Sequence, residues 1–113
     1  QWDKGKAFDT FGRVGPYIVT KDEIKDIQNL NLKLKLNGKV MQNSNTQNMI
    51  FSVTHLVSYL SYFMTLYPGD IITTGTPPGV GMGKKPQVFL KHGDEMELRI
   101  DGLGDQKQKV FSK

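Results

Sequence analysis

The 113-residue chain contains no cysteine and no long apolar run. The absence of cysteine excludes a disulfide framework and any thiolate metal site, and it is compatible with the cytoplasmic location that we expect. No apolar run approaches the roughly 20 residues of a membrane span, so we expect no membrane partner. The only histidines, His55 and His92, are far apart in the sequence and lack the spacing of paired metal ligands. We interpret both as structural or solvated.

The charge balance is basic but diffuse. The formal net charge is +4, from 15 Lys and Arg against 11 Asp and Glu. This excess suggests an alternative class of function, a non-catalytic module that binds anions or nucleic acid. Such a module needs a concentrated basic face, preferably with aromatic side chains for stacking. The lysines are instead scattered along the sequence, with small groups at 33–39, 84–85 and 107–113. We therefore expect them to be dispersed in the fold, and we expect no nucleic-acid partner.

Alternating apolar residues predict a hairpin and two later strands. Every second residue of 30–36 is leucine, which is the period of a half-buried strand. Asn37-Gly38 then predicts a type I′ turn, because both residues tolerate positive φ, with the return strand starting near Lys39. Residues 95–100 alternate again, and a last strand is predicted to end near Val110.

The remaining pattern predicts three more short strands and one helix. The apolar runs 15–20, 70–74 and 87–91 are predicted as strands, and 42–48 as a polar loop. From an N-cap at Ser52, apolar residues recur at helical spacing to Tyr67, and Pro68-Gly69 is predicted to end the helix. This order predicts an α+β fold, mostly β, with an antiparallel or mixed sheet.

Glu95 and Glu97 form a Glu-x-Glu pair whose carboxylates share one face of the predicted strand. Both could reach one hard cation. However, the intervening Met96, Leu98 and Ile100 would face the core, which favours glutamates that are exposed to water.

The loop TTGTPPGVGMGKKP (73–86) is rich in glycine and proline. It does not fit a phosphate-binding loop, because Pro78 stands where the first glycine of that motif is needed and the prolines lack N–H donors. Thr74, Gly75 and Thr76 offer hydroxyls and amides that could hold a small anion at a strand end. An ordinary connection is the alternative interpretation.

Taken together, these segments closely resemble the C-terminal half of the fumarylacetoacetate hydrolase family. The most specific segments are Gly-Lys-x-x-Asp-Thr (5–10) and Pro-Gly-Asp…Thr-Gly-Thr-Pro-x-Gly-Val-Gly (68–81). The chain looks most like bacterial ureidoglycolate lyases or 2,4-diketo-3-deoxy sugar-acid hydrolases. The resemblance implies a mixed β-sandwich roll with one main helix, incomplete in this chain. Residues 1–113 are then expected to form the C-terminal portion of a single catalytic domain of a dimeric enzyme.

The resemblance also implies a function. Family members typically use Mg²⁺ or Mn²⁺ to cleave a carbon–carbon bond in small 2,4-dioxo acids through a metal-stabilised enolate. An oxo-acid decarboxylase or isomerase and a ureidoglycolate lyase are the alternatives within the family.

By position, three residues match family site residues, and Gly75 is expected to bind substrate with one of them. Lys6 matches the catalytic lysine beside the metal and substrate, and Thr10 a threonine of the same site. Thr76 matches the residue that binds the substrate carboxylate, with Gly75 beside it. The family's metal ligands and its water-activating Glu/His pair lie upstream of the Gly-Lys motif. The resemblance therefore places no metal ligand in this chain, which alone is expected to be an incomplete enzyme.

Overall fold

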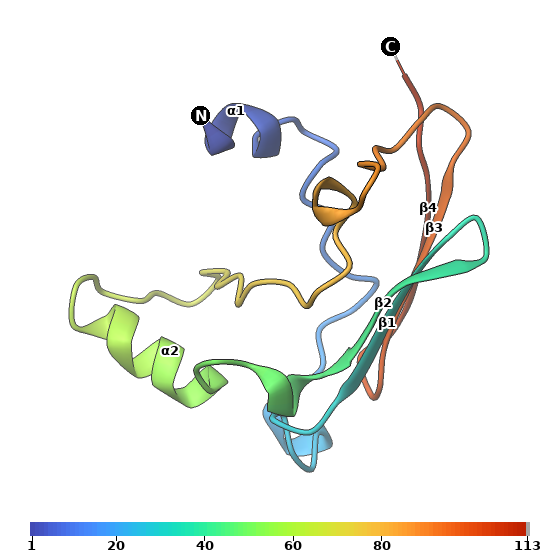
Figure 1. Ribbon diagram of the computed structural model, residues 1–113. Helices are drawn as coiled ribbons and strands as arrows, with labels where there is room; N and C mark the ends of the chain where they lie inside the picture. The colour runs from blue at the N-terminus through green and yellow to red at the C-terminus, as the bar shows by residue number, and fades with distance from the viewer. Residues whose placement is uncertain (113) are drawn as a thin grey trace.

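The computed structural model describes residues 1–112. These residues contain one four-stranded antiparallel sheet in the order β2-β1-β3-β4 (Figure 1). The strands are β1 (Asn31–Leu36), β2 (Lys39–Asn45), β3 (Glu95–Ile100) and β4 (Gly104–Lys109). The helices are α1 (Trp2–Lys6) and α2 (Val53–Ser61), with 3₁₀ turns η1 (Lys21–Glu23), η2 (Thr46–Asn48) and η3 (Gly81–Gly83). The predicted α+β class, mostly β with one main helix, is confirmed.

The turn between β1 and β2 has the predicted geometry. Asn37 has a φ of 51° and Gly38 a φ of 78°, as a type I′ turn requires. Asn37 also connects this hairpin to β3. Its Nδ2 donates to Asp94 Oδ1 at 2.9 Å, and its Oδ1 accepts from the Glu95 backbone N–H at 2.9 Å. The predicted turn at 92–94 therefore meets the first hairpin at the start of β3.

The two faces of the sheet differ in chemistry. In the β1–β3 register, Leu32, Leu34 and Leu36 lie opposite Ile100, Leu98 and Met96 and form an apolar face. The other face carries the charged side chains of the same strands. None of the side chains that the structure describes is fully buried, including those on the apolar face.

Residues 13–19 lie against the apolar face of β3 and β4. Arg13, Tyr17 and Val19 line a hollow together with Leu98 and Ile100. The prediction of a strand at 15–20 is wrong, because this segment has no ladder partner and is held by other contacts. Gln106 Nε2, for example, donates to the Gly15 carbonyl.

The strands predicted at 70–74 and 87–91 are also not formed. Most of their apolar side chains are exposed, with exposed fractions of 69% for Ile71 and 61% for Phe89, whereas Ile72 is half-buried. Both segments have the composition of a strand but pair with no other strand in residues 1–112. Composition alone does not satisfy the backbone groups of a strand, so these segments stay irregular.

The loop predicted at 42–48 is partly wrong, because β2 continues to Asn45. A β-bulge explains the longer strand. Leu36 pairs with Lys39 and Lys35 with Val40, but Leu34 pairs with Gln42, which leaves Met41 as the extra residue.

The N-cap of α2 is confirmed, since Ser52 Oγ accepts from the His55 N–H at 3.1 Å. The predicted extension to Tyr67 is wrong, because α2 ends at Ser61. At this end Ser61 Oγ donates to the Ser58 carbonyl at 2.6 Å, and Phe63 N donates to Leu60 O in a tighter turn. Such side-chain bonds to backbone carbonyls compete with helix continuation. No helix in residues 1–112 has the length and apolarity that a membrane crossing needs.

Candidate functional site

The glycine-rich loop 73–86 is attached to β2 through one side chain. Gln42 Nε2 donates to Thr76 Oγ1 at 2.9 Å and to the Pro77 carbonyl at 2.7 Å. Gln42 is half-buried, whereas Thr76 and Gly75 are exposed. The Thr-Gly-Thr segment is therefore held to β2 at Thr76, while Gly75 and Thr76 remain exposed to solvent.

Gly79 explains why the loop can lie so close to the strand. A Cβ at this position would overlap the Met41 carbonyl, and the φ of 113° further disfavours any other residue. Gly75 has a φ of 97°, a left-handed value that favours glycine immediately before Thr76. The glycines thus serve close backbone packing and left-handed backbone conformations, in agreement with the loop's poor fit to a phosphate cradle.

Lys6 and Thr10 lie at and just after the end of α1. Lys6 is in the last turn of this five-residue helix, and Thr10 is in the following turn, where Phe11 N donates to Phe8 O at 2.9 Å. Both side chains are exposed. Figure 1 shows α1 and the 73–83 segment on the same side of the sheet. Within residues 1–112, however, no hydrogen bond or ion pair joins Lys6 or Thr10 to Thr76.

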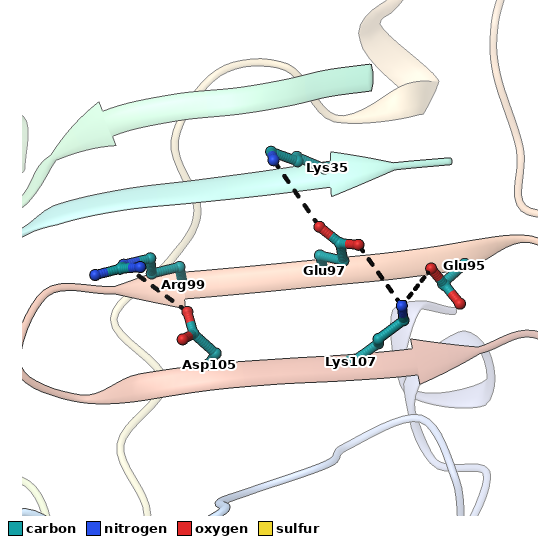
Figure 2. Close-up of polar contacts among 6 residues, drawn as sticks. All are labelled: Lys35, Glu95, Glu97, Arg99, Asp105 and Lys107. Carbon is teal, nitrogen blue, oxygen red and sulfur yellow. Dashed lines mark ion pairs between the residues drawn. The ribbon is translucent and has the colours of Figure 1, made fainter. Parts of the chain in front are cut away.

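The charged face of the sheet contains a ladder of ion pairs (Figure 2). Lys107 Nζ lies 2.8 Å from Glu95 Oε1 and 3.8 Å from Glu97 Oε1, and Lys35 Nζ lies 3.9 Å from Glu97 Oε2. The hydrogen bond to the Glu95 carboxylate, followed by the charge of that group, raises the pKa of Lys107. The prediction that both glutamates face water is confirmed, and their negative charge is already compensated by lysines.

The expectation of dispersed lysines is wrong for the sheet. The strand register places Lys33, Lys35 and Lys107 on one face. Lys35 and Lys107 lie opposite Glu97 from the two strands that flank β3, and Lys33 lies two residues from Lys35 on β1. Carboxylates share this face. In Figure 2, Glu97 lies between Lys35 and Lys107, Glu95 contacts Lys107, and Asp105 contacts Arg99. This face is therefore mixed in sign, which does not suit an extended polyanion.

The residues that the structure describes contain no group of three or more His, Asp or Glu side chains that could hold a metal ion. Of the histidines, His92 accepts through Nδ1 from the Ser112 N–H at 3.1 Å, and His55 stacks on Phe51 with ring centroids 4.9 Å apart. Both contacts favour the structural interpretation of these side chains.

Gln42 is the one residue of this site that sequence reasoning missed. A two-residue hairpin without a bulge would pair Gln42 with Lys33 and place it on the charged face. The extra residue, Met41, moves Gln42 opposite Leu34 and hence to the face where the loop lies. No local signal in the sequence marks the bulge, so the contact could not be predicted.

The sequence comparisons identify close relatives. The family profile described as "Fumarylacetoacetate (FAA) hydrolase C-terminal" matches residues 1–111. A protein of Burkholderia cenocepacia that carries a provisional name as a hydrolase is 61% identical over 111 residues, covering 97% of this chain and 39% of the relative. The chain thus spans about two-fifths of the length of the curated relatives it matches.

Solved structures match over nearly the whole chain. Fumarylacetoacetate hydrolase from Exiguobacterium antarcticum superposes with a TM-score of 0.93 at 38% identity, covering 97% of this chain and 39% of that one. 2-Hydroxyhepta-2,4-diene-1,7-dioate isomerase from Mycobacterium marinum gives 0.86 at 41% identity, covering 100% and 41%. Maleylpyruvate hydrolase from Sphingobium sp. SYK-6, solved with manganese(II) and pyruvate, gives 0.84 at 38% identity, covering 92% and 37%.

Proposed function

Because this chain belongs to the fumarylacetoacetate hydrolase family, we propose that it is the C-terminal part of a metal-dependent hydrolase that cleaves a carbon–carbon bond in a small 2,4-dioxo acid. The observation that carries the proposal is the fixed Thr-Gly-Thr loop, in a chain similar to a maleylpyruvate hydrolase that was solved with manganese(II) and pyruvate. Hydrolysis of a 2,4-dioxo acid consumes one water and yields a carboxylic acid and a 2-oxo acid. The similarity to that structure supports a site suited to 2-oxo acids.

The proposal assigns three roles to the residues of this chain. Thr76, with Gly75 beside it, holds the substrate carboxylate and so orients the carbonyl groups for reaction. The Lys6 ammonium stabilises negative charge that develops on a substrate oxygen once the site excludes water. Thr10 contacts the substrate at the same end of α1. These roles require the end of α1 to approach the loop in the whole protein.

The described residues do not fit a divalent cation, because Glu95 and Glu97 are paired with lysines and no three-ligand group is present among residues 1–112. We therefore place the ligands of Mg²⁺ or Mn²⁺, and the groups that activate water, in the part of the protein outside these 113 residues. A divalent cation held there would act as a Lewis acid toward the oxo acid. The proposal also includes a homodimer in the cytoplasm.

Two alternatives belong to the same family. Similarity to an isomerase at 41% identity supports an isomerase of oxo acids as the second candidate. A decarboxylase or a ureidoglycolate lyase would use the same carboxylate contact. All of these activities keep the roles of Lys6 and Thr76 and differ in the bond that changes.

The test is a turnover assay of the full-length protein with a panel of 2,4-dioxo acids, with Mg²⁺ or Mn²⁺ and with a chelator. We expect turnover that requires the metal and that falls at least tenfold in Lys6→Ala, since removal of one stabilising charge commonly costs that much. Lys4→Ala, two residues earlier on the same helix, is the matched control and should keep activity. Turnover that a chelator leaves unchanged would contradict the proposal.

A further inference from the structure

The β-bulge at Met41 changes the face from which Gln42 projects. Without the bulge Gln42 would lie opposite Lys33 among the charged side chains. With the bulge it lies opposite Leu34 and meets the loop at Thr76 and Pro77. Bulges commonly re-aim a side chain next to a functional site. The β-bulge at Met41 therefore brings Gln42 into contact with the loop.

The two hydrogen bonds of Gln42 fix the direction of its amide. The Pro77 carbonyl can only accept, so the amide atom that faces it at 2.7 Å must be Nε2 and not Oε1. The same Nε2 lies 2.9 Å from Thr76 Oγ1. Both N–H groups of the amide are then used, and Thr76 Oγ1 must act as an acceptor toward Gln42.

This assignment determines what the Thr76 hydroxyl can still do. A hydroxyl has one proton to donate and two lone pairs to accept. Because Gln42 occupies a lone pair, the Thr76 proton points away from Gln42, and the side chain is exposed. A donor that is already oriented toward solvent suits an anionic acceptor, and a bond to a charged group is stronger than one between neutral groups.

We propose that Gln42 is a positioning residue that orients the Thr76 hydroxyl as a donor to the substrate carboxylate. This inference rests on the proposed function, because it requires that Thr76 binds a carboxylate. It adds that the affinity of the site depends on a side chain that does not itself touch the substrate, and that the polarity of this side chain matters more than its size.

Two substitutions of Gln42 separate polarity from volume. Gln42→Met has a similar length but cannot donate to Thr76 or Pro77. Gln42→Glu keeps the shape but, when ionised, accepts the Thr76 proton and faces the Pro77 carbonyl with a negative charge. Gln47→Met and Gln47→Glu are the matched controls, because Gln47 is exposed on η2 only five residues away.

The experiment measures the dissociation constant of pyruvate in the presence of Mn²⁺, with the full-length protein and these variants. We expect Gln42→Met to raise this dissociation constant about tenfold, which corresponds to the loss of one hydrogen bond to the charged carboxylate. Gln42→Glu should raise it by roughly a hundredfold, since repulsion of the carboxylate is added. In turnover, KM should rise much more than kcat, because the carboxylate contact exists in both ground and transition states. The Gln47 variants should match the wild type.

A double-mutant cycle tests whether Gln42 acts through Thr76. Thr76→Val should weaken pyruvate binding on its own, and Gln42→Met added to it should weaken binding no further. Fully additive effects would overturn the inference, as would unchanged affinity in a folded Gln42→Met protein. If Gln42→Met proves unstable in thermal unfolding, Thr76→Val and Gln42→Glu still test whether Gln42 acts through Thr76. A loss of pyruvate affinity that merely follows a loss of stability would also overturn the inference.

The same experiment distinguishes a failure of the proposed function from a failure of the role of Gln42. If the wild-type protein binds no pyruvate with Mn²⁺ and shows no chelator-sensitive turnover, the proposed function is wrong and the inference falls with it. If the wild-type protein binds pyruvate but the Gln42 variants bind it equally well, only the role of Gln42 is wrong.

Discussion

Two sets of apolar segments in this chain differ in whether they form paired strands. Residues 31–45 and 95–109 form a sheet in which every strand has a partner, and their leucines are half-buried. Residues 15–20, 70–74 and 87–91 have an equally apolar composition but form no ladder, and Ile18 is 89% exposed. The difference lies in pairing. The sheet is built from two hairpins closed by short turns, whereas the other segments have no neighbouring partner in the sequence.

The largest expected effect is a charge placed on the apolar face of the sheet. Leu98 lies opposite Leu34 on the next strand, so Leu98→Asp would put a carboxylate between half-buried leucines. We expect a loss of about 2–3 kcal/mol in the free energy of unfolding, from lost apolar burial and desolvation of the charge. Because none of the described side chains is fully buried, the chain should not tolerate this loss. Urea denaturation followed by circular dichroism checks it.

The matched substitution in the unpaired region sharpens the comparison. Ile18→Asp changes a residue that is 89% exposed, so the unfolding midpoint of this chain should stay within the range of ordinary surface changes, about 0.5 kcal/mol. If Ile18→Asp were as destabilising as Leu98→Asp, the segment 15–20 would be part of the folded core and the contrast would fail.

The contrast also explains what the sequence could and could not predict about the fold. The hairpin at Asn37-Gly38 and the strand at 95–100 were correctly predicted, because period and turn signal lie in one contiguous stretch. The prediction of strands at 70–74 and 87–91 is wrong, because the composition of a strand does not specify the strand with which it pairs. The bulge at Met41 follows from contacts across the sheet, which a local pattern does not contain.

The candidate site shows the same division. Thr76 was found by resemblance to a family motif, and its role remains a prediction. Its partner Gln42 falls in the predicted polar loop 42–48, since nothing near it in the sequence indicates that it faces the glycine-rich loop. Contacts between segments that are 34 positions apart, as Gln42 and Thr76 are, depend on how the chain returns to the sheet.

A second prediction concerns the corner where the two hairpins meet. Asn37→Ala removes the bonds to Asp94 and to the Glu95 N–H and puts a Cβ-bearing residue without a compensating side chain at a φ of 51°. We expect a loss of about 1–2 kcal/mol in the free energy of unfolding. Asn37→Gly keeps the backbone freedom and should recover part of this loss. Equal stability of all three proteins in urea would show that this corner does not hold the sheet together.

A third prediction uses pH at the same corner. The hydrogen bond from the Asn37 side chain, followed by that from the Lys91 N–H, lowers the pKa of Asp94. A lowered pKa in the folded state means that the stabilisation is present above the ordinary aspartate value, about 3.9, and is lost as the pH falls through the folded value. Asp94→Asn should therefore flatten the acid limb of a stability–pH profile. An unchanged acid limb would exclude Asp94 as a contributor.

A smaller effect than that of the sheet substitutions is expected on α2, which lies outside the paired sheet. Phe51, His55, Tyr59 and Phe63 stack along one side of this segment, and the Tyr59 and Phe63 ring centroids are 5.0 Å apart. Tyr59→Ser should lower the free energy of unfolding by about 0.5–1 kcal/mol, the usual contribution of an aromatic pair. Tyr62→Ser is the matched control, because Tyr62 is 82% exposed and should contribute almost nothing. Equal values for the two substitutions in urea would show that the aromatic stack adds no stability to α2.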